Sequence, residues 1–92
     1  MDKFEYKVRA EEIKSLIASK EYVQAAEIAD TIDWRRVKSV MMLCTVSDLY
    51  KINRRYEDAR DMLLLAYDRH PGVILKSLTR RIFGKHLLSI SN

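Results

Sequence analysis

Cys44, His70 and His86 are the side chains of this sequence best suited to nucleophilic, acid–base or metal-binding chemistry. Such chemistry needs a nucleophile beside a base, or several ligands at metal-binding spacing. His70 directly precedes Pro71, where a helix is expected to end, and His86 stands among basic residues. Apolar neighbours of Cys44 disfavour the thiolate, which is the reactive form. We interpret the histidines as surface or capping residues and Cys44 as a small, unreactive side chain.

The carboxylates offer no catalytic pair either. Glu11-Glu12 and Glu57-Asp58 are adjacent in sequence, and neighbouring positions of a helix point about 100° apart. A glycine-rich phosphate-binding loop is also missing from the sequence, because Gly72 and Gly84 are its only glycines. The sequence predicts a protein without catalytic activity, with no cofactor and no metal.

Composition and spacing predict that helices carry these side chains. Two glycines and one proline in 92 residues are too few for the turns of an all-β protein, while 48% hydrophobic and 33% charged residues are typical of a folded domain. Apolar residues recur at intervals of three and four, which is the helical period. The predicted helices cover residues 2–18, 22–32, 33–52, 56–70 and 73–89.

Polar residues mark the expected helix ends. Asp2 and Glu5 have the spacing of a capping box. Asp33 is the predicted N-cap of the third helix, with Trp34 in its first turn. Asn53 is expected to adopt the left-handed conformation that ends many helices. The third helix is apolar on nearly every side, so it is predicted to form the centre of the fold.

The chain is expected to be soluble and cytoplasmic. A single cysteine cannot form an intrachain disulfide, which favours a reducing compartment. The first residues lack the apolar core of a signal peptide, and no apolar run approaches the ~20 residues that span a bilayer. We therefore expect no membrane contact.

The sequence repeats weakly at a distance of 34 residues. Tyr22 and Tyr56 are 34 positions apart, as are Ala25 and Ala59, and each pair stands near the start of the second helix of a predicted hairpin. This distance is the period of the tetratricopeptide repeat. The chain resembles that family best over residues 40–73, where the positions of the family pattern hold Leu43, Val46, Ser47, Tyr50, Ala59, Leu63 and Pro71.

The resemblance is uneven along the chain. Tyr50, Ala59 and Pro71 match the family pattern outright, whereas residues 6–39 form a degenerate copy in which only the alanine is of the expected type. The resemblance implies an all-α fold in which antiparallel helical hairpins stack as a short right-handed array of five helices. It implies one domain over the whole chain, with a terminal helix after the second repeat. A generic helical bundle is the alternative fold.

The resemblance also implies a function, because this family binds protein or peptide segments on the concave face formed by the first helix of each hairpin. The chain is accordingly predicted to be a binding scaffold. The candidate groove residues are Lys7, Glu11, Lys14, Met41, Cys44, Thr45, Asp48 and Lys51. Family members that clamp a C-terminal carboxylate use lysines, asparagines and an arginine at positions that here hold Ala10, Lys14, Thr45, Leu75 and Thr79. Since only Lys14 is cationic, such a clamp is not expected.

A short array also predicts contact between copies of the chain. Each repeat leaves an apolar face for its neighbour, and about three repeats are needed to cover these faces. Leu63, Leu64 and Leu65 exceed what one helical stripe buries. We expect either a homo-oligomer or a terminal helix that folds back as a cap.

Nucleic-acid binding is the alternative function. A net charge of +4 favours it, as do three basic clusters. The clusters consist of Arg35, Arg36 and Lys38, then Lys51, Arg54 and Arg55, then Lys76, Arg80, Arg81 and Lys85. No stacking aromatics and no groove-entering motif accompany them, so we interpret the clusters as solvated faces.

The two functions differ in their dependence on salt. We expect no gel shift of duplex DNA or single-stranded RNA by the chain at low salt, because the basic residues are mixed with acidic ones along the sequence. A shift at about 50 mM salt that disappears near 200 mM would instead favour nucleic-acid binding.

Overall fold

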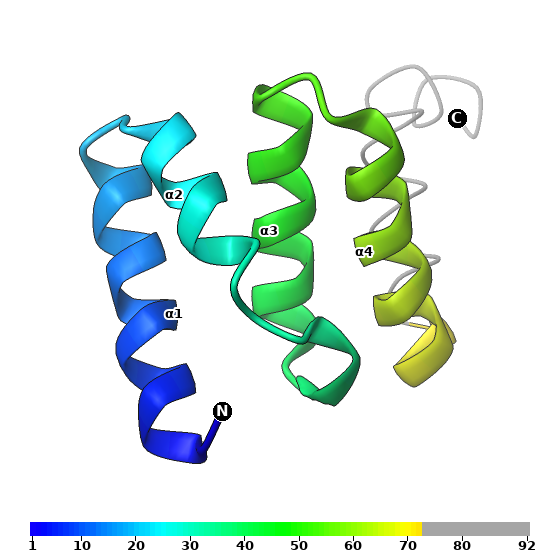
Figure 1. Ribbon diagram of the computed structural model, residues 1–92. Helices are drawn as coiled ribbons and strands as arrows, with labels where there is room; N and C mark the ends of the chain where they lie inside the picture. The colour runs from blue at the N-terminus through cyan, green and yellow to red at the C-terminus, as the bar shows by residue number, and fades with distance from the viewer. Residues whose placement is uncertain (73–92) are drawn as a thin grey trace, which may run out of the picture.

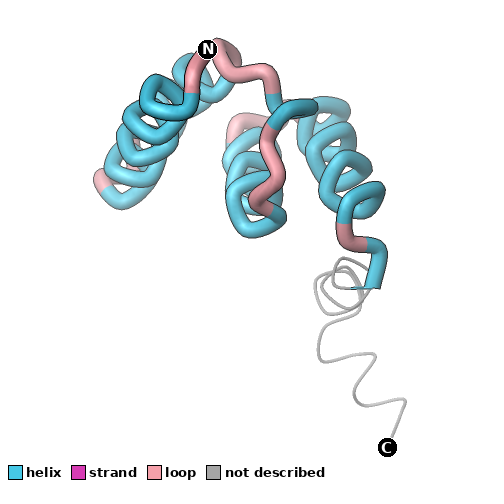
Figure 2. The backbone as a smooth tube through the Cα atoms, turned by 90° about the horizontal axis from the view of Figure 1, so that it is seen from below, coloured by secondary structure: helices cyan, strands magenta, loops and turns pink. Residues whose placement is uncertain are grey.

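The computed structural model describes residues 1–72, which form helices joined by loops (Figure 1; Figure 2). The all-α prediction is confirmed for these residues. The predicted terminal helix over residues 73–89 lies outside the described residues. The described elements are α1 (Lys3–Ala18), α2 (Tyr22–Ala29), the 3-10 helix η1 (Trp34–Arg36), α3 (Val40–Ile52) and α4 (Tyr56–Arg69).

The α-helices of residues 1–72 lie side by side in chain order (Figure 1). Short turns join α1 to α2 and α3 to α4 at one end of the molecule. The N-terminus and the longer connection between α2 and α3 lie at the other end. Packing is closest within each helix pair, and α2 also packs against α3. The described residues therefore form two adjacent antiparallel hairpins.

The turns that close the two hairpins have the same backbone geometry. Lys20 has a φ of 62° and Arg54 a φ of 61°, and the two residues are 34 positions apart. In both turns the next amide donates to the carbonyl five positions back at 2.8 Å. The two turns therefore repeat at the same distance of 34 residues as Tyr22 and Tyr56.

The prediction that Asn53 adopts the left-handed conformation is wrong, because Arg54 adopts it instead. Asn53 has a φ of −83°. Its side-chain amide donates to the carbonyl of Leu49 at 3.0 Å and to the carbonyl of Tyr22 at 3.1 Å. Since Tyr22 begins α2, the second bond links the two hairpins. Asn53 is the cap of α3 and the left-handed residue follows it, as Lys20 follows Ser19, the cap of α1.

One predicted helix cap is confirmed and the other is wrong. Asp2 caps α1, where its carboxylate accepts from the amide of Glu5 at 2.8 Å. Asp33 caps only the short helix η1. The third α-helix begins later, at Val40, and the hydroxyl of Ser39 caps it.

Burial of Trp34 explains why the third α-helix starts late. The Trp34 side chain lies in the core, and its Nε1–H donates to the carbonyl of Ala29 at 2.9 Å. A buried indole N–H needs such an acceptor. Because Ala29 is the last residue of α2, the chain must turn back to bring the ring there. This turn also ends α2 before Ile32, which was the predicted end.

The core is built around α3, as its apolar sequence predicts. This helix packs against both α2 and α4, and it buries Met42, Leu43, Val46, Ser47, Leu49 and Tyr50. Small side chains allow the neighbouring helices to approach it, namely Ala25, Ala26, Ala29, Ala59 and Ala66. The buried Ser47 hydroxyl donates to the carbonyl of Ala59 at 2.8 Å, so its hydrogen-bonding capacity is used.

A charged cluster joins the end of α2 to the turn between α3 and α4. Two guanidinium nitrogens of Arg55 donate to the two carboxylate oxygens of Asp30, each at 2.9 Å. The Tyr50 hydroxyl donates to Asp30 at 2.9 Å, and the Arg55 Nε donates to Asp58 at 2.8 Å. The Arg55 guanidinium also lies 4.4 Å from the centre of the Tyr50 ring. Paired hydrogen bonds of this kind are stronger and more directional than a single ion pair.

The cluster shifts the titration of its members. Hydrogen bonds from Arg55 hold the pKa of Asp30 below its usual range. Burial, together with the bond to Asp30, raises the pKa of Tyr50. A carboxylate with a lowered pKa stabilises the fold at neutral pH, and this contribution disappears as the pH falls through the lowered value.

Replacing the left-handed residues by glycine tests the turn geometry. We expect Lys20→Gly and Arg54→Gly each to raise the free energy of unfolding by about 0.5 kcal/mol, because glycine adopts a positive φ without a Cβ clash. Ser19→Gly is the matched control, since Ser19 has a φ of −88°. It should lower stability by about 0.5–1 kcal/mol through the greater freedom of the unfolded chain. Urea denaturation measures the stability of all three variants. Equal losses of stability in Lys20→Gly, Arg54→Gly and Ser19→Gly would contradict the turn geometry.

Removing the charge of Asp30 tests the junction between the hairpins. We expect Asp30→Asn to lower the free energy of unfolding at pH 7 by about 1 kcal/mol, since solvent screens a pair whose side chains are 44% and 37% exposed. The difference from the wild type should shrink as the pH falls below about 4, the ordinary pKa of an aspartate, and should vanish once the pH has passed the lowered pKa of Asp30. Urea denaturation at pH 7, 5 and 3 measures it.

Asp61→Asn is the matched control for this substitution, because Asp61 forms an exposed pair with Arg60 at 3.7 Å. It should change stability by less than about 0.5 kcal/mol. Equal effects of the two substitutions, or a loss for Asp30→Asn that grows at low pH, would contradict the proposed role of the cluster.

Candidate protein-binding surfaces

The predicted groove residues of the first helix lie on the surface. Lys7, Glu11 and Lys14 are exposed on α1. The Lys14 Nζ lies 3.4 Å from a carboxylate oxygen of Glu11, and both side chains are more than half exposed. Such a pair holds its members weakly, so each side chain remains accessible to a partner.

The predicted groove residues of the third helix differ in exposure. Met41 is 80% exposed, and Asp48 and Lys51 are also exposed. Thr45 is half-buried, and its hydroxyl donates to the carbonyl of Met41 at 2.8 Å. Cys44 is half-buried and packs against the core. The predicted residues thus form one patch on each hairpin, which we call the α1 patch (Lys7, Glu11, Lys14) and the α3 patch (Met41, Cys44, Thr45, Asp48, Lys51).

Apolar side chains also remain at the surface of α4. Leu64 is 58% and Tyr67 41% exposed, whereas Leu63 and Leu65 are half-buried. The run of three leucines is therefore only partly covered by the described residues, which agrees with the sequence prediction. Arg69 of the same helix donates to the carbonyl of Arg35 in η1.

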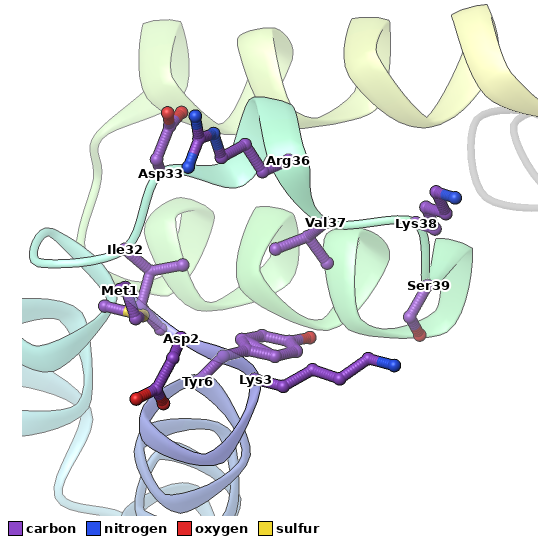
Figure 3. A pocket seen from close by; sticks show the side chains of 10 residues that line it. All are labelled: Met1, Asp2, Lys3, Tyr6, Ile32, Asp33, Arg36, Val37, Lys38 and Ser39. Carbon is purple, nitrogen blue, oxygen red and sulfur yellow. The ribbon is translucent and has the colours of Figure 1, made fainter.

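A hollow of about 650 Å³ lies between the start of α1 and the connection that leads to α3 (Figure 3). We call it the N-terminal hollow. It is lined by Met1, Asp2, Lys3, Tyr6, Ile32, Asp33, Arg36, Val37, Lys38 and Ser39. None of these residues belongs to the predicted groove, so sequence reasoning missed this site. The available signal was the segment around residues 32–38, whose apolar residues do not follow the helical period.

The wall of the N-terminal hollow is fixed by two contacts between α1 and the α2–α3 connection. The Tyr6 ring meets the Trp34 ring edge to face, with centroids 6.4 Å apart. Arg9 donates to the hydroxyl of Thr31 at 3.0 Å and to its carbonyl at 3.3 Å. These contacts hold a non-helical segment against α1 without filling the space beside it.

The acidic residues of the hollow already have partners. The Asp2 carboxylate caps α1. Asp33 accepts from the Nε of Arg35 at 3.1 Å, and this bond lowers the pKa of Asp33. Burial raises the pKa of Tyr6 above its ordinary value, which already keeps the phenol protonated at neutral pH. Lys3 and Lys38, in contrast, form no hydrogen bond or ion pair within residues 1–72.

Comparison with known proteins does not decide the family. No protein-family model, curated protein or solved structure matches the chain. Within residues 1–72, no helix is long and apolar enough to cross a membrane. In the same part of the chain, no three side chains of histidine, cysteine, aspartate or glutamate converge as metal ligands would.

Proposed function

We propose that the chain is a protein- or peptide-binding module of the tetratricopeptide type, and that it has no catalytic activity. The observation that carries this proposal is the repetition of one turn at a distance of 34 residues, with left-handed Lys20 and Arg54 at equivalent places. Buried Ala25 and Ala59, also 34 apart, support it because small residues permit close packing of paired helices.

The proposed binding surface combines the α1 patch and the α3 patch. Met41 supplies apolar contact area, and Lys7, Lys14 and Lys51 supply positive charge near the acidic Glu11 and Asp48. An exposed methionine can adapt to different partner side chains because its side chain is flexible and polarisable. A surface with both apolar and charged groups suits a protein segment better than a small metabolite, which usually binds in a concave apolar pocket.

The charges of the described residues weaken the nucleic-acid alternative. Arg55 of the predicted basic edge pairs with Asp30 and Asp58, and Arg35 pairs with Asp33. Paired guanidinium groups are less available to phosphates.

Affinity capture with surface variants tests the proposal. The immobilised chain is incubated with a cell lysate, and bound proteins are identified by mass spectrometry. We expect Met41→Asp and Lys51→Glu each to reduce recovery of the main partner about tenfold, because each change puts a negative charge on the proposed surface. Val23→Asp and Arg60→Glu are matched controls, since both residues are exposed on α2 and α4.

The controls decide how the result is interpreted. Recovery that is unchanged in both test variants would contradict binding by the α3 patch. Equal losses of partner recovery in the test and control variants would indicate a general effect of added charge. This result would also contradict the proposed surface.

A further inference from the structure

We propose that the N-terminal hollow binds a peptide segment in which an acidic side chain stands beside a bulky apolar one. The inference rests on the proposed function in one respect, namely that the partner is a protein. It adds a second binding site, whose residues are distinct from the α1 and α3 patches. The residues that line the hollow determine which side chains of a partner segment can bind there.

The size and lining of the hollow suit an apolar side chain. Its volume of about 650 Å³ exceeds that of a single side chain, so it has room for an apolar side chain together with its charged neighbour. Ile32 and Val37 lie in its wall, and both belong to the hydrophobic core, as does the ring of Trp34 behind Tyr6. A leucine or phenylalanine placed against this wall would remove apolar surface from water.

The charges of the hollow are separated. Figure 3 shows Asp2 and Asp33 at one end of the view and the amino groups of Lys3 and Lys38 toward the other. Arg36 reaches toward Asp33 in the same view and helps to lower the pKa of its carboxyl group. At the acidic end, Asp33 is therefore paired with arginine and Asp2 is bonded to a backbone amide, whereas Lys3 and Lys38 at the other end have no acidic partner within residues 1–72.

The combination of these two features identifies the occupant as an acidic peptide. An apolar wall contributes little to binding phosphates, and recognition of single-stranded nucleic acid usually uses aromatic faces on which bases stack. The Tyr6 ring instead packs against Trp34. A carboxylate near Lys3 and Lys38 gains favourable charge interactions, while a basic segment would be repelled.

Fluorescence of Trp34 tests the proposal, because Trp34 is the only tryptophan and touches Tyr6 of the hollow wall. The first probe is an acetylated, amidated hexapeptide with two glutamates followed by leucine and phenylalanine, flanked by glycines. In the second probe lysines replace the glutamates, and in the third serines replace the leucine and phenylalanine. We expect saturable binding of the first probe, and at least about tenfold weaker binding of the other two.

Charge reversal of the two lysines assigns the binding to the hollow. The double variant Lys3→Glu with Lys38→Glu should bind the first probe about tenfold more weakly than the wild type. The matched control is Lys20→Glu with Arg60→Glu, whose residues are exposed and lie outside the hollow. It should bind within about twofold of the wild type. Urea denaturation of each variant confirms that it is folded.

Several results would overturn the proposal. They are absence of binding by the first probe, equal binding of the acidic and basic probes, and equal effects of the two double variants. Two other results would overturn it by assigning the hollow to a different occupant. One is a dimer in sedimentation that is lost in the double variant Lys3→Glu with Lys38→Glu. The other is a gel shift of single-stranded RNA that the same variant abolishes. If these tests fail while Met41→Asp still abolishes capture of a partner, the inference is wrong and the proposed function stands.

Discussion

The indole of Trp34 can be buried only where its N–H finds an acceptor, and the last carbonyl of α2 provides one. This single requirement determines the path of the chain between the hairpins. It ends α2 at Ala29, places η1 against α4 with the Trp34 ring beside Tyr6 of α1, and delays α3 until Ser39 can cap it. The N-terminal hollow follows from the same requirement, because the chain crosses beside α1 as a loop with exposed polar side chains.

A second constraint, made of polar contacts, holds the two hairpins together. From the turn between α3 and α4, the side chain of Asn53 bonds to Tyr22 at the start of α2, and Arg55 bonds to Asp30 at the end of α2. The end of α2 therefore takes part in two links, one through the buried ring of Trp34 at Ala29 and one through polar groups near the surface at Asp30. The first link depends on apolar burial, and the second depends on the ionisation of Asp30.

The helices could be predicted from the sequence because their apolar residues follow the helical period. Asp2, the hairpin α3–α4 and the central position of α3 were predictable for this reason. The start of α3 was not, since Asp33 and Ser39 are both good capping residues and only the contact of Trp34 with Ala29 decides between them. Asn53 was assigned the left-handed conformation from its intrinsic preference, whereas its bond to Tyr22 is a tertiary contact that local sequence does not reveal. Exposure of Lys7, Met41 and Lys51 follows from helix periodicity, but the hollow is built from a segment without any period.

The location of Arg36 and Lys38 has a consequence for the divergence of this protein. Both residues are exposed and neither belongs to an α-helix. Replacing them alters neither the helix interiors nor the core residues Ile32, Trp34 and Val37 that fix the connection. Mutations could therefore change the charge preference of the hollow while leaving stability nearly constant. In this part of the molecule, selectivity is free to evolve independently of the fold.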